Sequence, residues 1–157
     1  MNSVNKSTCV SFFVAGKPQG KARPRFTRTG HTYTPDKTRC YEQDIALSYT
    51  AAGGSYHGDK AYIKLKVTSV YPLPKRANKS VQRAMLTHEQ LPSVKPDIDN
   101  ILKAVLDSLN GIAYADDKQV ICTECCKVYG ERAGLSITLE AYEPQRVDRV
   151  IEECLGV

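Results

Sequence analysis

The sequence predicts a single α+β domain whose sheet is mixed, mostly antiparallel and packed by helices. Segments with apolar residues at every second position, as in strands, alternate along the chain with segments whose apolar residues recur every three or four positions, as in helices. Their order, with strands in succession after the central helix, is typical of α+β domains. The length of 157 residues suits one domain with a real hydrophobic core. Apolar and charged contents of 41% and 25% are ordinary for a globular protein.

The first predicted strand, Val10 to Val14, leads into a basic segment at residues 16–25. Two glycines and two prolines exclude a regular helix there, so we expect an extended, exposed chain. Residues 1–40 hold eight Lys or Arg against one acid, whereas the remaining chain is slightly acidic, within a net charge of +5. This asymmetry indicates a polyanionic partner such as a phosphate backbone, and a solvated basic face is the alternative.

The first predicted helix follows Tyr33, with Thr34 as its N-cap and Pro35 at the first helical position. It ends at a Gly-Gly pair, and its apolar stripe comprises Tyr41, Ile45, Tyr49 and Ala52. At this spacing we predict that the tyrosines belong to the core rather than stack on bases.

A half-buried strand is predicted over Ala61 to Tyr71, where apolar residues alternate with lysine and threonine. From Lys60 to His88 there are seven basic residues and no acidic one, which gives a second cationic patch. Asn78 to Leu86 has poor helical periodicity. We interpret that segment as a surface loop, with a short helix that orders on the substrate as the alternative.

The central stretch, Lys95 to Ile121, contains two pairs of carboxylates that bracket one predicted helix of about three turns. Asp97 and Asp99 alternate on an extended lead-in to an apolar stripe, which stops at an Asn-Gly pair. Asp116 and Asp117 follow a short apolar run. We expect a return strand from about residue 112 to carry this second pair back alongside the first.

Each acidic pair alone has an ordinary explanation, because aspartates before a helix are commonly caps and Asp-Asp-Lys is typical of a turn. Together they indicate a metal site. Asp97 and Asp99 point the same way on an extended backbone, and carboxylates gathered this closely repel one another unless a cation lies among them. Hard oxygen ligands suit Mg²⁺ or Mn²⁺. Lys103 lies one helical turn after Asp99, a placement that suits phosphoryl chemistry.

Two further strands are predicted over Gln119 to Tyr129 and Leu135 to Tyr142, followed by a helix that opens at Pro144. The Cys122-x-x-Cys125 spacing raises the question of zinc, but no second pair of this kind follows. In a strand these two side chains point to opposite faces. We therefore expect no zinc, and reduced thiols that act as small apolar residues.

The run KPDIDNILKAVLDSLNGIAYADDKQV closely resembles the RusA family of Holliday junction resolvases, which are small metal-dependent endodeoxyribonucleases. The pattern is Asp-x-Asp-Asn, a lysine four residues after the second aspartate, and Asp-Asp-x-Gln after the helix. A weaker likeness covers the N-terminal Gly-x-Pro and Arg-Pro-Arg. The resemblance implies that Asp97, Asp99 and Asp117 are catalytic and metal-binding, that Lys103 is catalytic, and that Asp116 is less important than Asp117. Charge and resemblance together give these candidate DNA contacts: Lys17, Lys21, Arg23, Arg25 and Arg28.

The implied function is a Mg²⁺-dependent endonuclease, with Mn²⁺ as a substitute, that resolves four-way junctions by paired symmetric nicks in DNA recombination and repair. A homodimer is implied too, because two symmetric nicks need two sites related by a two-fold axis. Three alternatives stay open. They are a nuclease for flaps or forks, a DNA-binding protein whose carboxylates are only caps, and a zinc-binding interaction module built on Cys122, Cys125 and Cys126.

No run is apolar enough to span a membrane, and residues 1–10 lack the hydrophobic segment of a signal peptide. We therefore expect a cytoplasmic protein without membrane contact. We treat residues 1–157 as one domain with a basic N-terminal strand and arm over 1–40 and an acidic centre over 95–121.

Overall fold

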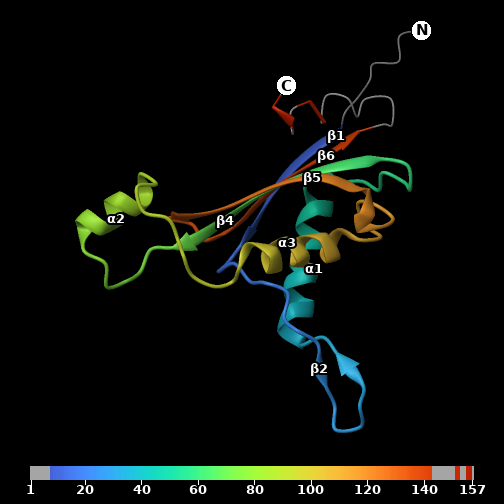
Figure 1. Cartoon of the computed structure of the whole chain (residues 1–157), viewed down its shortest axis with the longest axis horizontal. Helices are drawn as coiled ribbons and strands as arrows, with labels where there is room; N and C mark the ends of the chain where they lie inside the picture. Colours follow the sequence, from blue (N-terminus) through green and yellow to red (C-terminus); the bar gives the residue numbers. More distant parts are fainter. Residues whose placement is uncertain (1–7, 143–150, 153–154, 157) are drawn as a thin grey trace.

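The main sheet has four strands within the computed structural model, which describes residues 8–142, 151–152 and 155–156. Their order across the sheet is β1 (Thr8–Ala15), β6 (Gly134–Tyr142), β4 (Tyr62–Pro72) and β5 (Val120–Gly130). β6 pairs antiparallel with β1 and β4, whereas β5 pairs parallel with β4. The predicted mixed, mostly antiparallel sheet is confirmed (Figure 1).

β4 has a neighbour on each edge, and its side chains alternate as predicted. Ile63, Leu65 and Val67 are fully buried in the core, whereas Lys64 and Lys66 point to the opposite face of the sheet. The same core receives apolar side chains from β1 and β6: Phe12, Val14, Leu135, Ile137 and Leu139. One face of the sheet is therefore apolar and needs a covering layer.

Two helices cover that apolar face, α1 (Asp36–Ala51) and α3 (Ile98–Leu109) (Figure 1). α1 buries Tyr41, Ile45 and Tyr49, which confirms the core position of the tyrosines, whereas the fourth predicted stripe residue, Ala52, is the exposed C-cap residue. α3 contributes one apolar face to the same core: Ile101, Ala104, Val105 and Leu109. The periodicity therefore predicted which face of each helix is inside.

The ends of two helices differ from the prediction. Pro35, not Thr34, occupies the N-cap position of α1, and no side chain caps that end. Residues interpreted as a surface loop form a helix, α2 (Lys79–Leu86), because Asn78 Oδ1 accepts a hydrogen bond from the Val81 N–H at 2.9 Å. Met85 is the buried side chain of α2, and it lies outside the main core cluster.

The connection from β4 to β5 carries α2 and α3 and decides where the acidic residues lie. The predicted return strand near residue 112 is not formed. Residues 111–114 make a turn, and β5 begins only after a short 3₁₀ helix, η1 (Asp117–Gln119). Because β5 runs parallel to β4, the start of β5 lies beside the start of β4. β5 and β6 are not partners, since β4 separates them.

A second, two-stranded sheet is formed by β2 (Arg25–Phe26) and β3 (Thr32–Tyr33). This hairpin projects from the body of the protein beyond the start of α1 (Figure 1). The predicted helix after Pro144 falls largely outside the described residues. Within the described ranges, none of the helices is long and apolar enough to cross a membrane.

Candidate acidic centre and basic groove

Asp97 occupies the N-cap position of α3 with extended backbone dihedrals, but its side chain makes no capping hydrogen bond. Asp99 lies in the first helical turn, so the predicted extended lead-in is correct for Asp97 and wrong for Asp99. Both carboxylates are exposed, and Asn100 Nδ2 donates a long hydrogen bond of 3.4 Å to Asp99 Oδ1. The cap explanation therefore fails at this end of the helix. Negative charge here is favoured by the positive end of the helix dipole.

Lys103 is exposed on α3, one helical turn after Asp99. Because α3 is continuous through Asp99 and Lys103, the two side chains lie on the same face of the helix, as predicted. The opposite face of α3 is buried in the core. A cation and a carboxylate are thus presented to solvent at the beginning of one helix.

The two residues of the second acidic pair, Asp116 and Asp117, have different environments. Asp116 is a structural cap, because its Oδ1 accepts a hydrogen bond from the Lys118 N–H at 3.0 Å. That bond lowers the pKa of Asp116 below its usual value, with the charge of Lys118 acting in the same direction. Asp117 begins η1 and is exposed. Asp116 thus has a structural task in this turn, and its lesser catalytic importance stays a prediction.

Gln119 fixes the turn that carries Asp117. Its Oε1 accepts hydrogen bonds from the backbone N–H groups of Ala115 and Asp116 at 2.8 and 3.1 Å. Its Nε2 donates to the carbonyls of Gly58 and Ala61, both at 2.9 Å. Gln119 is buried, so all of these bonds are shielded from water. It acts as a positioning residue for the acidic turn.

The two acidic pairs lie at opposite ends of α3. Asp97 immediately precedes this helix, and Asp117 follows it after a short turn, at the start of β5. The helix has 12 residues, and a rise of 1.5 Å per residue puts its ends about 18 Å apart. Among the described residues, no three Asp, Glu, His or Cys side chains gather into a metal-binding group. The prediction that a single chain brings Asp117 back beside Asp97 is therefore wrong.

Instead, the basic N-terminal segment runs along the start of α3. The Lys21 N–H donates to the Asn100 carbonyl at 2.9 Å. Gly20 permits this approach, because a Cβ atom there would lie 2.9 Å from the Cβ atoms of both Asn100 and Pro96. Pro96 is anchored on its other side, where the Tyr71 hydroxyl and Lys127 Nζ each donate to its carbonyl at 3.1 Å. Two segments distant in sequence are thereby fixed side by side.

An open groove of about 770 Å³ lies between these segments. Asp97 and Asn100 line it together with four exposed cations: Lys17, Arg23, Lys37 and Lys95. Lys37 and Lys95 were not among the predicted contacts. Lys95 could have been found from its position next to Pro96-Asp97. Lys37 lies beside this groove only because α1 starts there, which no local pattern reveals.

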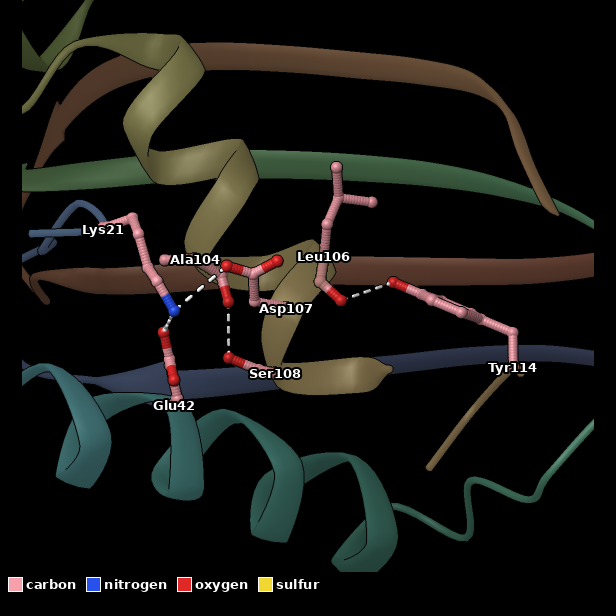
Figure 2. Close-up of polar contacts among 7 residues, drawn as sticks. All are labelled: Lys21, Glu42, Ala104, Leu106, Asp107, Ser108 and Tyr114. Atoms are coloured by element: carbon pink, nitrogen blue, oxygen red, sulfur yellow. Dashed lines mark hydrogen bonds and ion pairs between the residues drawn. The ribbon is translucent and has the colours of Figure 1, made fainter. Parts of the chain in front are cut away.

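Lys21 is not available to DNA in the way the sequence suggested. Its ammonium group lies between α1 and α3, where it pairs with Glu42 and, at 3.0 Å, with Asp107 (Figure 2). Its side chain is 19% exposed. Desolvation lowers the pKa of Lys21, but hydrogen bonds and charge from the two carboxylates outweigh it and leave the pKa raised. Lys21 therefore holds the basic segment to the helices.

The other predicted contacts, Lys17, Arg23, Arg25 and Arg28, are exposed, the last two on the β2–β3 hairpin.

Figure 2 also shows how the end of α3 is secured. Ser108 Oγ donates to the Ala104 carbonyl, and the buried Tyr114 hydroxyl donates to the Leu106 carbonyl at 2.9 Å. The Tyr114 hydrogen bond thus ties the turn after α3 back to the last turn of the helix.

The cysteines of β5 separate across the sheet. Cys122 pairs in register with Lys64 and Cys125 with Val67, so their side chains point to opposite faces as predicted. Cys125 packs against the core, and burial raises the pKa of its thiol. The apolar role expected of all six cysteines is correct for Cys125 and wrong for the exposed Cys9, Cys40 and Cys126.

Comparison with known proteins assigns the chain to a family. Residues 15–140 match the family described as Endodeoxyribonuclease RusA, a match that runs from the end of β1 through most of β6 and includes both acidic pairs. The chain is also 33% identical over 140 residues to YqaN of Bacillus subtilis (strain 168), a protein whose name assigns it no activity. That alignment covers 83% of this chain and 95% of YqaN. The chain therefore belongs to the RusA family of endodeoxyribonucleases, which resolve Holliday junctions.

Proposed function

We propose that this protein is a divalent-metal-dependent, structure-selective endodeoxyribonuclease that acts on four-way DNA junctions in the cytoplasm, in recombination and repair. The observation that carries the proposal is the groove in which Asp97 faces Lys17, Arg23, Lys37 and Lys95. Cations of this kind neutralise successive phosphates and fix the register of a DNA strand without reading its sequence. The strand would thereby pass directly over the carboxylate end of α3.

The donor chemistry at this end suits Mg²⁺, with Mn²⁺ as a substitute. Asp97 and Asp99 are exposed, and among the described residues neither is in an ion pair with a lysine or arginine. Their hard oxygen atoms are the ligands that these ions prefer. Mg²⁺ held by Asp97, Asp99 and Asp117 would polarise the scissile phosphate and make a nearby water more acidic.

The chain's own residues have separate tasks in this proposal. Lys103 stabilises the negative charge that develops on the phosphate oxygens during attack, because its ammonium is displayed on the same helix face as Asp99. The groove cations hold the strand on both sides of the reacting phosphate. Gln119 acts at a distance by fixing the turn that carries Asp117.

The separation of the carboxylates supports a homodimer in this proposal. One chain leaves Asp117 at the far end of α3 from Asp97, and both side chains are exposed. A two-fold related copy therefore supplies the third carboxylate of each centre in our proposal. Two such centres per dimer would give the paired nicks that junction resolution requires.

The substrate is tested with labelled four-way junctions, flaps, forks and linear duplex of matched sequence. The proposal expects paired, symmetric nicks in the four-way junction and little cleavage of duplex. Preferred cleavage of flaps or forks would leave the metal-dependent nuclease in place and overturn the resolvase assignment. Binding to junctions without cleavage in either metal would identify a DNA-binding protein instead.

The shared centre is tested by mixing Asp99→Asn and Asp117→Asn proteins, each inactive alone. If each centre takes carboxylates from two chains, a mixed dimer has one intact centre and nicks one strand of the junction. If each centre belongs to one chain, both centres of the mixed dimer are defective. Absence of nicking in a mixture shown to contain mixed dimers would contradict the two-chain arrangement.

A further inference from the structure

The β2–β3 hairpin has no packing role that explains its sequence. Every residue from Arg23 to Tyr33 is exposed, and the hairpin stands away from the sheet and helices (Figure 1). Its two strands are only two residues long each. An isolated two-stranded hairpin is at best marginally stable in water. Binding to a partner molecule would fix the position of such a hairpin.

The tip of the hairpin is nevertheless held in one conformation by hydrogen bonds. The Gly30 N–H donates to the Thr27 carbonyl at 3.0 Å, and the Thr27 N–H donates to the His31 carbonyl at 2.7 Å. Thr27 Oγ1 accepts a further hydrogen bond from the His31 N–H at 3.0 Å. Gly30 has a φ of +83°, which glycine adopts without strain. These contacts close a tight turn, so the hairpin presents its side chains in a defined arrangement.

Phe26 is the unusual residue of this hairpin. Its side chain is 75% exposed, the highest exposure among the large apolar residues that the structure describes. It lies opposite Thr32 across the two strands, so no aromatic neighbour covers it there. Arg25 and Arg28 flank it, and no acidic residue occurs in the chain before Asp36. An uncovered aromatic ring between cations matches the chemistry of nucleic acid, where a base face stacks on the ring and phosphates meet the cations.

The hairpin also rises from the rim of the groove. Arg23 and Lys37, which precede and follow the hairpin in the chain, both line the groove that contains Asp97. Phe26 is three residues beyond Arg23, about 10 Å along an extended chain. That reach corresponds to about three nucleotide steps along one strand. A base that meets Phe26 would thus lie within a few nucleotides of the strand held at Asp97.

We propose that the β2–β3 hairpin senses the branch point of DNA: Phe26 stacks on a base that is left unstacked where helices part, beside the strand held in the groove. This inference rests on the proposed function and adds the basis of its substrate choice. Within continuous duplex the base faces are already stacked on their neighbours, so Phe26 finds no free face. At a branch point stacking is interrupted, and the ring gains a partner that duplex does not offer.

The test uses the full-length protein and a four-way junction with the fluorescent base 2-aminopurine at the branch point, in EDTA so that no strand is cut. Wild-type protein is compared with Phe26→Ala, Phe26→Trp and the control Leu47→Ala. Leu47 is 68% exposed on α1, away from groove and hairpin, so its truncation matches the loss of exposed apolar surface. Junction and duplex affinities, 2-aminopurine fluorescence and sedimentation are measured for each protein.

We expect Phe26→Ala to weaken junction binding about tenfold, the size typical of one lost base–aromatic stack. Duplex binding should change less than twofold. The quenching of 2-aminopurine fluorescence that we expect when wild-type protein binds the junction should disappear. Phe26→Trp should restore both junction affinity and quenching, and Leu47→Ala should match wild type throughout. Because Phe26 is exposed, the variants should unfold at the wild-type temperature.

Three results would overturn the inference. Equal junction affinity and quenching for wild type and Phe26→Ala would remove the stacking role while leaving the nuclease proposal intact. A change from dimer to monomer in Phe26→Ala would identify the hairpin as a contact between two copies. Failure of the wild-type protein to bind any branched DNA would overturn the proposed function itself, and the inference with it.

Discussion

Replacing Lys21 by methionine separates a structural role from a DNA-binding role for this residue. Methionine keeps the length and the apolar stem of the side chain but removes the charge. In the wild-type protein the ammonium group lies between Glu42 and Asp107, which belong to α1 and α3 (Figure 2). The substitution leaves these two carboxylates facing each other without a cation.

The size of the effect follows from the exposure of the three side chains. Lys21 and Glu42 are each 19% exposed and Asp107 is 29% exposed, so the cluster is mostly shielded from water. Exposed ion pairs contribute about 0–1 kcal/mol, whereas breaking a fully buried one costs about 3–5 kcal/mol. We expect an intermediate loss of about 1–3 kcal/mol in the free energy of unfolding. For a domain of this size that loss lowers the melting temperature by roughly 3–10 °C.

The assay is urea unfolding followed by circular dichroism, with Lys17→Met as the matched control. Lys17 is exposed and lines the groove, so its substitution should weaken DNA binding without changing stability. The stabilisation by Lys21 is present at neutral pH and is lost as the pH rises through its raised pKa, above 10.5. If Lys21→Met were as stable as wild type and lost DNA affinity as Lys17→Met does, the structural role would be refuted.

Three further predictions concern the same elements. Gly20→Ala should cost about 1–3 kcal/mol of stability and reduce junction cleavage, because its Cβ would overlap Asn100 and Pro96; wild-type stability in urea would contradict this. Gln119→Ala should lower both the unfolding midpoint and cleavage, whereas Asp117→Asn should lower cleavage alone, as thermal melts and junction assays would show. Asp116→Asn should be less stable than wild type at neutral pH, and this difference should shrink as the pH falls below about 4. The reason is that Asp116, whose pKa is lowered in the fold, stabilises the protein only while its carboxylate is charged; a difference independent of pH would refute the capping role.

The core could be predicted because it depends on local periodicity. Alternation over residues 61–71 identified the buried face of β4, and the spacing of Tyr41, Ile45 and Tyr49 identified that of α1. These patterns need no knowledge of partners, since any covering layer makes the same demand on each segment. The short helix α2 was interpreted as a loop because eight residues make only about two helical turns, too few for a periodic pattern to be decisive.

The sequence identified candidate residues for the site but not their arrangement in space. Asp97, Asp99 and Lys103 share the start of one helix, so their proximity follows from sequence spacing. The position of Asp117 depends on the parallel pairing of β5 with β4, which sends the chain to the far end of α3. Likewise, Lys21 faces Glu42 and Asp107 only because two helices pack together. Contacts of that kind are set by topology, which no single segment encodes.

The carboxylates at the start of α3 are central to the proposed chemistry, and one cleavage measurement tests them. A labelled four-way junction is incubated in Mg²⁺ with wild-type protein, Asp99→Asn and the control Asp44→Asn, an exposed carboxylate on the solvent side of α1. EDTA is added to a parallel set. We expect paired nicks with wild type and Asp44→Asn. With Asp99→Asn or EDTA the cleavage rate should fall at least about a hundredfold, the size typical of one lost electrostatic contact in a catalytic site. Cleavage by Asp99→Asn at the wild-type rate, or undiminished cleavage in EDTA, would contradict the proposed chemistry.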